Sequence, residues 1–121
     1  MQGNTKLTNI MQQTRQQKIA RLLQKELGDI FLAVAKQHQG TLISVSEVRV
    51  SPDLSIAHTY LSIFPDAKAQ EMLNIVNDNI RTIRFELGNR VRHQLRIIPE
   101  LRFHHDKTID YLENIDNLLN Q

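Results

Sequence analysis

The chain has 121 residues, 40% of them hydrophobic, and its formal net charge at neutral pH is +2. This length suits a single domain, and the apolar fraction is enough for a core without metal or disulfide support. The absence of cysteine excludes disulfide frameworks, thiolate metal sites and cysteine catalysis.

The N-terminal segment, residues 1–13, is polar and has no apolar signal-peptide core. We expect it to form a flexible leader, followed by a single domain over residues 14–121. No apolar run approaches the roughly 20 residues of a membrane-spanning helix. These features predict a soluble cytoplasmic protein with no membrane partner.

From Thr14 onward, apolar residues recur at spacings of three and four, which predicts a helix that ends near Gly40. Lys18 and Lys25 lie between the apolar positions and belong to the exposed side of this helix. Gly28 interrupts the pattern, and close packing of another element is the expected reason for it.

Two strands joined by a turn are predicted next. Residues 41–50 are rich in β-branched side chains and roughly alternate in polarity. Residues 51–53, Ser-Pro-Asp, have turn chemistry, and residues 54–64 form the second strand of the hairpin. One face of the second strand is expected to carry Ala57, Thr59, Leu61 and Ile63.

Residues 67–95 are predicted to be helical, with or without a break. One continuous apolar stripe runs along them at helical spacing, formed by Leu73, Val76, Ile80, Ile83, Leu87, Val91 and Leu95. At 100° per residue, a second arc of the same helix carries Arg81, Arg84, Gly88 and Arg92. These arginines therefore cluster in space if the helix runs through them.

A third strand is predicted over residues 96–105, in which Pro99 marks a strand start, a bulge or an edge. Ile97, Leu101 and Phe103 are expected to share one face. Asp106 suits the N-cap of a short amphipathic helix that reaches Leu119. The fold class is then α+β, a three-stranded sheet covered on one face by helices.

Charge is concentrated in residues 81–102, where six arginines and no lysine face only two glutamates. A guanidinium binds phosphate through two parallel hydrogen bonds and stays charged, which favours contact with nucleic acid over mere solubility. A solvated helix face is the alternative. Aromatic residues make up only 5%, so base stacking is not expected to dominate. The candidate RNA-binding residues are Arg81, Arg84, Arg92, Arg90, Arg96, Lys18 and Lys25.

Other chemistry is weakly represented. His104 and His105 are adjacent in a predicted strand and point to opposite faces, so they do not readily share a metal ion. Ser51 and Asp53 are explained by their turn, and no histidine lies near them in sequence. The glycines are too far apart for a phosphate-binding loop or a Gly-x-x-Gly clamp. We therefore predict a protein that is not an enzyme and needs no metal or other cofactor.

Three segments carry a family resemblance: residues 48–55, Val-Arg-Val-Ser-Pro-Asp-Leu-Ser; residues 83–88, Ile-Arg-Phe-Glu-Leu-Gly; and residues 96–106, which contain Pro-Glu-Leu-Arg-Phe. In this order and spacing, the chain resembles bacterial ribosome-binding factor A over about residues 14–119. It departs from the family pattern between residues 74 and 84, where no Ala-x-Gly bend is present. Asn79 is the expected position of the bend, since asparagine tolerates left-handed backbone.

The resemblance implies a type II KH-like domain of order α-β-β-α-α-β with a short C-terminal helix. It implies a factor that binds the maturing small ribosomal subunit and its ribosomal RNA, aids late rRNA processing and subunit maturation, and supports growth in the cold. It also implies a GTPase that helps to release the factor, which we expect to be a monomer.

Two alternative functions remain open. The first is a protein–protein interaction module that acts through the acidic C-terminal helix without RNA contact, because residues 106–121 carry a net charge of −3. The second is a small hydrolase, for which no nucleophile–base pair or metal set is recognisable.

Overall fold

The computed structural model describes residues 14–106; the predicted leader and C-terminal helix lie outside these residues. The elements in chain order are α2 (Arg15–Lys36), β1 (Leu42–Val50), β2 (Ile56–Phe64), the 3₁₀ turn η1 (Asp66–Lys68), α3 (Ala69–Asp78), α4 (Ile80–Val91) and β3 (Glu100–His105). Within the described part of the chain, no helix has the length and apolar character needed to cross a membrane.

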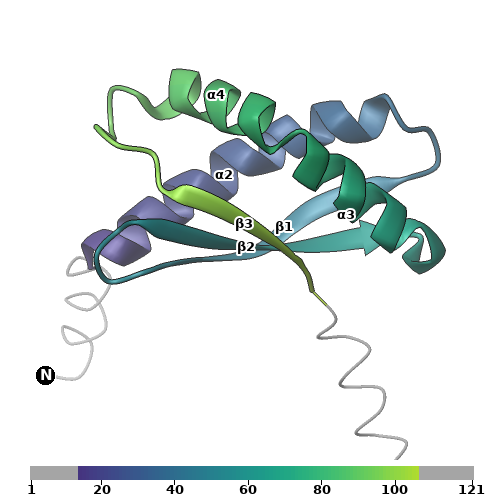
Figure 1. Ribbon diagram of the computed structural model, residues 1–121, viewed down its shortest axis with the longest axis horizontal. Helices are drawn as coiled ribbons and strands as arrows, with labels where there is room; N and C mark the ends of the chain where they lie inside the picture. Colours follow the sequence, from purple (N-terminus) through teal and green to yellow (C-terminus); the bar gives the residue numbers. More distant parts are fainter. Residues whose placement is uncertain (1–13, 107–121) are drawn as a thin grey trace, which may run out of the picture.

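The three strands form one sheet in the order β1-β2-β3. β1 and β2 pair antiparallel as a hairpin, whereas β2 and β3 pair in parallel. The helices α2, α3 and α4 all lie over one face of this sheet, and no described element covers the other face (Figure 1). The predicted α+β class and the order α-β-β-α-α-β are therefore confirmed.

Helix α2 begins at a capping box. Thr14 accepts a hydrogen bond from the Gln17 backbone amide, and the Gln17 side chain accepts one from the Thr14 amide. The helix ends at Lys36, and Gly40 follows with a φ of 82°, a conformation that favours glycine. The close packing expected at Gly28 is wrong, because a Cβ there would have no neighbour within 4 Å.

Strand β1 contains a bulge that explains its imperfect alternation. The pairing register with β2 shifts between Val45 and Glu47. Without a bulge, Val45 and Val48, three residues apart, would point to opposite faces of the sheet. The extra residue at the bulge turns them to the same face, so Ile43, Val45, Val48 and Val50 all face the helices.

The predicted helical region of residues 67–95 is two helices that meet at Asn79. The Asn79 side-chain amide donates to the carbonyl of Ile75 at 2.7 Å, which satisfies a carbonyl at the end of α3. The Asn79 carbonyl in turn accepts from the amide of Ile83 in α4. The position of the bend is confirmed. The expected left-handed backbone is wrong, since Asn79 has a negative φ of −107° with ψ 18°.

The helix and the strand that flank residues 92–99 are both shorter than predicted. α4 ends at Val91, and β3 begins at Glu100, directly after Pro99, which has no amide hydrogen to donate. The Glu100 amide donates to Ser55 at 2.8 Å and so starts the pairing with the hairpin. The prediction that Ile97 shares the buried face of Leu101 and Phe103 is wrong: Ile97 is 80% exposed.

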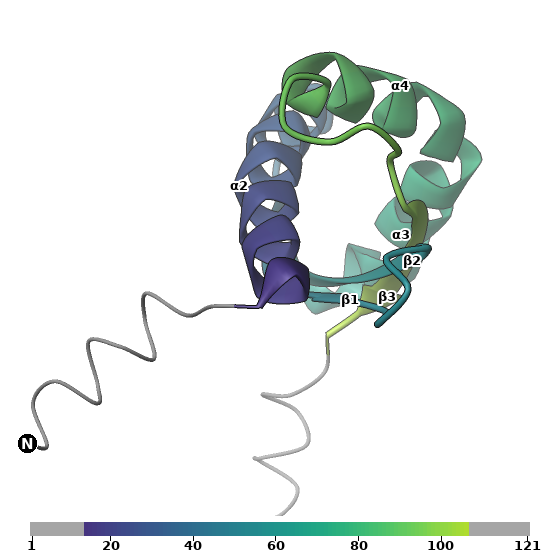
Figure 2. The same cartoon turned by 90° about the vertical axis from the view of Figure 1, so that its left-hand side faces the viewer.

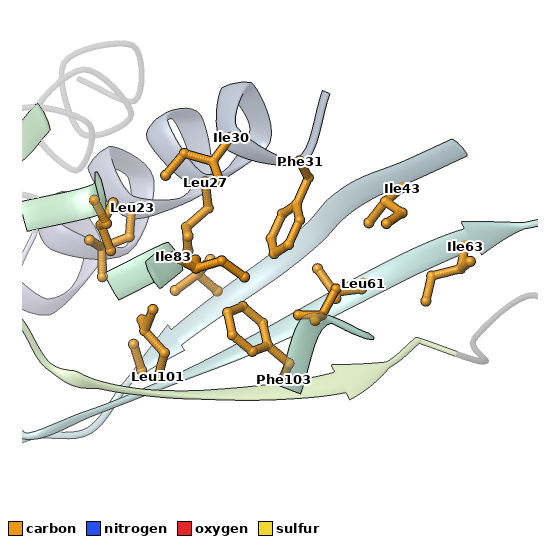
Figure 3. Packing of buried hydrophobic residues seen from close by; sticks show 14 of the residues in the cluster. Leu23, Leu27, Ile30, Phe31, Ile43, Leu61, Ile63, Ile83, Leu101 and Phe103 are labelled. Carbon is orange, nitrogen blue, oxygen red and sulfur yellow. The ribbon is translucent and has the colours of Figure 1, made fainter. Parts of the chain in front are cut away.

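The core lies between the sheet and the helices (Figure 3). Phe31 of α2 and Phe103 of β3 meet edge to face, with ring centroids 5.6 Å apart. Leu61 of β2 and Leu87 of α4 are fully buried in the same cluster. The face of β2 predicted to be internal is confirmed as buried: Ala57, Thr59, Leu61 and Ile63.

Candidate nucleic-acid interface

The face of α4 that points away from α2 forms a shallow depression with the loop that follows the helix. Arg81, Arg84, Phe85 and Ile98 line it, and its volume is about 480 Å³. Both arginines are exposed. Since no acidic side chain lines it, the depression combines positive charge with an exposed aromatic ring, which is the chemistry of a nucleic-acid surface.

Arg84 also has a structural role in this surface. Its guanidinium donates to the carbonyl of Ile98 at 2.7 Å, which holds residues 92–99 against α4. Gly88 lies under the same loop, because a Cβ built there would be 3.8 Å from Ile98 Cγ1. Arg84 therefore offers only part of its hydrogen-bonding capacity to a ligand.

Arg81, Arg92 and Arg96 are exposed and make no hydrogen bond or ion pair with another described residue. Arg81 lies in the first turn of α4, Arg92 directly follows the helix, and Arg96 belongs to the loop after it. An exposed arginine without a carboxylate partner keeps its full charge and its planar donor edge for a phosphate.

Arg90 lies on the opposite flank of α4, where it contacts α2. Its guanidinium is 3.4 Å from Glu26, 3.8 Å from Asp29 and 3.3 Å from Glu86. Partial burial opposes the charge of Arg90, but hydrogen bonds to Glu26 and Glu86 outweigh it and raise its pKa. Because three carboxylates surround this cation, it connects two helices and offers little charge to a polyanion.

Lys18 and Lys25, the two remaining predicted contacts, are exposed on α2. Neither forms an ion pair with a described residue. The depression is lined by residues of α4 and the loop after it, so the structure does not bring these lysines of α2 into it.

Phe85 is a site residue that composition did not predict. It is 73% exposed and lines the depression together with Arg81 and Arg84. A signal was present in the sequence: Phe85 falls outside the apolar stripe defined by Ile83 and Leu87. An aromatic residue that is off the buried face of an amphipathic helix exposes a flat ring on which a base can stack.

The uncovered face of the sheet differs in its electrostatics. Arg49 pairs with Glu47 at 2.8 Å, and Arg102 pairs with Glu100 at 3.5 Å. Each arginine on this face therefore has a neutralising partner two residues away in its own strand. Replacing the two paired arginines of this face therefore serves as a control for replacing arginines on α4.

His58 of β2 and His104 of β3 contact each other. His58 Nδ1 and His104 Nε2 are 2.9 Å apart, and their rings stack with a centroid distance of 5.2 Å. Across residues 14–106, no group of three or more histidine, aspartate or glutamate side chains has the geometry to hold a metal ion. The Ser51 and Asp53 side chains bond each other at 2.7 Å within the β1–β2 turn, as their turn chemistry predicts.

The chain is similar in sequence to known proteins. The family model described as Ribosome-binding factor A matches residues 15–119. A Ribosome-binding factor A of Flavobacterium psychrophilum is 43% identical over 111 residues, which cover 90% of this chain and 85% of the relative. That of Christiangramia forsetii is 45% identical over 104 residues, covering 84% and 79% of the two chains.

Solved structures agree in fold. The crystal structure of ribosome-binding factor A from Thermus thermophilus matches with a TM-score of 0.63 and 23% identity, over 76% of this chain and 97% of the other. A Thermus thermophilus ribosome-binding factor A model, fitted into a cryo-EM map of a 30S complex, matches with a TM-score of 0.58 and 26% identity. That match covers 71% of this chain and 89% of the other.

Proposed function

Since the chain belongs to the ribosome-binding factor A family, we propose that it is a non-enzymatic assembly factor that binds the maturing small ribosomal subunit. The relative fitted into a 30S complex supports this partner. We further propose that contact is made with the ribosomal RNA of that subunit through the outer face of α4, and that binding aids late rRNA processing, particularly at low temperature.

The observation that carries the proposed RNA contact is an unpaired cation beside an exposed ring on α4, with a second unpaired cation directly after the helix. Arg81 and Arg92 have no carboxylate partner among residues 14–106, and Phe85 is exposed beside Arg81. By contrast, the arginines of the sheet face are paired with glutamates. A polyanion is therefore attracted to α4 rather than to the sheet.

Binding to purified small subunits tests this assignment. The double variant Arg81→Gln/Arg92→Gln is expected to co-sediment about tenfold more weakly than the parent at moderate salt, because each lost phosphate contact removes about 0.7–0.9 from the slope of log K against log salt. Both side chains are exposed, so the thermal unfolding midpoint of the variant should match that of the parent.

The control is Arg49→Gln/Arg102→Gln, which removes the same charge from the uncovered sheet face. It is expected to bind nearly as well as the parent. Equal loss in the two double variants would mean that net charge alone matters, and unchanged binding by the α4 variant would refute the proposed interface. Arg84 is left intact because its bond to Ile98 supports the loop.

We also propose that a GTPase helps to release the factor from the subunit.

The alternative function is a protein–protein interaction module that uses residues 107–121 and does not contact RNA. These residues lie outside the described part of the chain. A chain truncated after Asp106 separates the two functions. RNA-dependent binding should persist in the truncated chain if α4 forms the interface, and it should disappear if the C-terminal segment provides the contact.

A further inference from the structure

A second hollow lies at the end of the molecule where α2 begins, next to the loop that packs on α4. Three segments meet there: the first turn of α2, the β1–β2 turn, and residues 92–99 (Figures 1 and 2). The cavity they enclose is about 370 Å³, within the roughly 300–1,000 Å³ of small-ligand sites.

The floor and rim of this hollow are apolar. Ile19 and Pro99 are buried, Leu54 and Leu95 are half-buried, and Ile97 is 80% exposed. A large apolar side chain that stays in solvent at the mouth of a pocket favours a ligand with an apolar flat face.

Two cations flank the apolar lining. Arg15 and Arg96 both line the hollow, both are exposed, and neither has a hydrogen-bond or ion-pair partner among residues 14–106. They come from segments that are far apart in the sequence, so only the fold brings them to one site. Two unpaired guanidinium groups at one opening suit a phosphate group.

The wall formed by the β1–β2 turn is held rigidly. Asp53 Oδ1 accepts hydrogen bonds from the Ser51 and Ser55 hydroxyls, both at 2.7 Å, and from the Ser55 amide at 3.2 Å. The hydroxyl bonds from Ser55 and Ser51 lower the pKa of Asp53, which stays ionised at neutral pH. The other oxygen, Oδ2, has no partner among the described residues and can accept from a base amino group or a ribose hydroxyl.

The same turn carries backbone strain. Leu54 has a φ of 64°, in the left-handed region that non-glycine residues rarely adopt, and its amide donates to Ser51 at 2.9 Å. Such a conformation is unfavourable for a residue other than glycine, and residues that retain it concentrate at binding and active sites. Here it places the Leu54 side chain in the lining of the hollow.

From this geometry we propose that the hollow binds one unstacked nucleotide of a single-stranded RNA, with its phosphate between Arg15 and Arg96 and its base against Leu54 and Ile97. The proposal deepens the proposed function and rests on it, because residues 96–99 connect the two surfaces. Ile98 faces Arg84 on α4, while Ile97 and Pro99 line the hollow. A single-stranded RNA that runs along α4 past Arg92 therefore reaches this pocket.

The test is a titration of the full chain with adenosine 5′-monophosphate, monitored through backbone amide NMR shifts. Saturable shifts are expected at Leu54, Ser55, Arg96 and Ile97. The variant Ile97→Ser, at an exposed position, should reduce the affinity for the nucleotide several-fold, because serine removes the apolar surface against which the base packs. It should leave the weaker binding of ribose 5-phosphate unchanged.

The variants separate this pocket from the α4 face. Arg15→Gln/Arg96→Gln should abolish the nucleotide shifts, whereas Arg81→Gln/Arg92→Gln should preserve them. Equal binding of ribose 5-phosphate and the nucleotide would reduce the pocket to an anion site and overturn the proposal. The proposal would also be overturned if a leucine-containing acidic peptide caused these NMR shifts and the nucleotide did not, because the hollow would then bind a protein segment.

Failure of this inference can be told from failure of the proposed function. If the nucleotide causes no shifts while the Arg81/Arg92 variant still releases small subunits, only the pocket assignment is wrong. If the nucleotide binds while subunit binding ignores Arg81 and Arg92, the α4 interface is wrong and the pocket stands.

Discussion

The hydroxyl of Thr59 is fully buried in the middle of β2 and has no hydrogen-bond partner among residues 14–106. Its neighbours across the sheet are Val48 in β1 and Phe103 in β3, and both are buried and apolar. A buried polar group without a partner loses its bonds to water and gains none in return. This position therefore lowers the stability of the fold.

Thr59→Val is expected to raise the free energy of unfolding by about 1 kcal/mol, because a methyl group replaces the unpaired hydroxyl at nearly the same volume. Urea denaturation measures the change. Thr59→Ser is the matched control: it keeps the hydroxyl and loses the methyl group, and it should be less stable than the parent. A valine variant no more stable than the parent would show that the hydroxyl is satisfied in solution.

At the scale of the elements, the four sides of α4 have different surroundings. Arg90 connects one flank to Glu26 and Asp29 of α2, and Arg84 connects the other flank to Ile98. The buried side carries Ile83, Leu87 and Val91. Among residues 14–106, no element packs on the remaining outer face. The arginines of one helix therefore have different roles.

Helix α2 contains a glycine that its environment does not require. Gly28→Ala is expected to stabilise the protein by about 0.5–1 kcal/mol, because alanine loses less backbone entropy in a helix and no other element comes within 4 Å of the new Cβ. Thermal and urea unfolding should both report the gain. Gly40→Ala is the control and should destabilise, since Gly40 has a φ of 82°. A loss of stability at position 28 would reveal a requirement for glycine there.

At the scale of the whole molecule, the two sides of the sheet have different properties. The covered side holds the core, and the uncovered side carries a row of stacked rings across β2 and β3. Tyr60 and His104 stack with centroids 5.0 Å apart, and His104 also contacts His58. Arg49 lies over the ring of Tyr60 at 5.7 Å. This row connects the antiparallel hairpin to the parallel strand.

Acidification should weaken the fold through His104. Burial, and then the nearby His58 and Arg102, lower the pKa of His104 below its usual value of about 6.5. The folded protein then binds fewer protons than the unfolded chain, so stability is retained above about pH 6.5 and lost as pH falls through the lowered pKa. Urea midpoints between pH 7.5 and 5.5 should fall.

His104→Gln should flatten this pH dependence, whatever its effect on stability at pH 7.5. The control is His93→Gln, because His93 is exposed in the loop after α4, and the parental slope should persist in it. An unchanged slope in the His104 variant would assign the pH dependence to other groups.

Local sequence patterns were sufficient to predict most of the elements. The apolar spacing of three and four in α2, the turn chemistry of residues 51–53 and the period-two alternation of β2 act over a few residues, so each can be recognised without the rest of the chain. The capping box at Thr14 is equally local, but it was recognised only in the structure. The arginine-rich face of α4 follows from helical geometry in the same way. The candidate interface was thus partly visible as a pattern of charge and periodicity.

Only the tertiary structure distinguished the roles of the individual cations. Whether an arginine is free depends on which carboxylates or carbonyls approach it from other elements, as Glu26 approaches Arg90 and Ile98 approaches Arg84. The pocket between Arg15 and Arg96 likewise exists only because α2, the hairpin turn and the loop before β3 converge. Contacts between distant segments are set by packing of the whole core, and no local pattern encodes them.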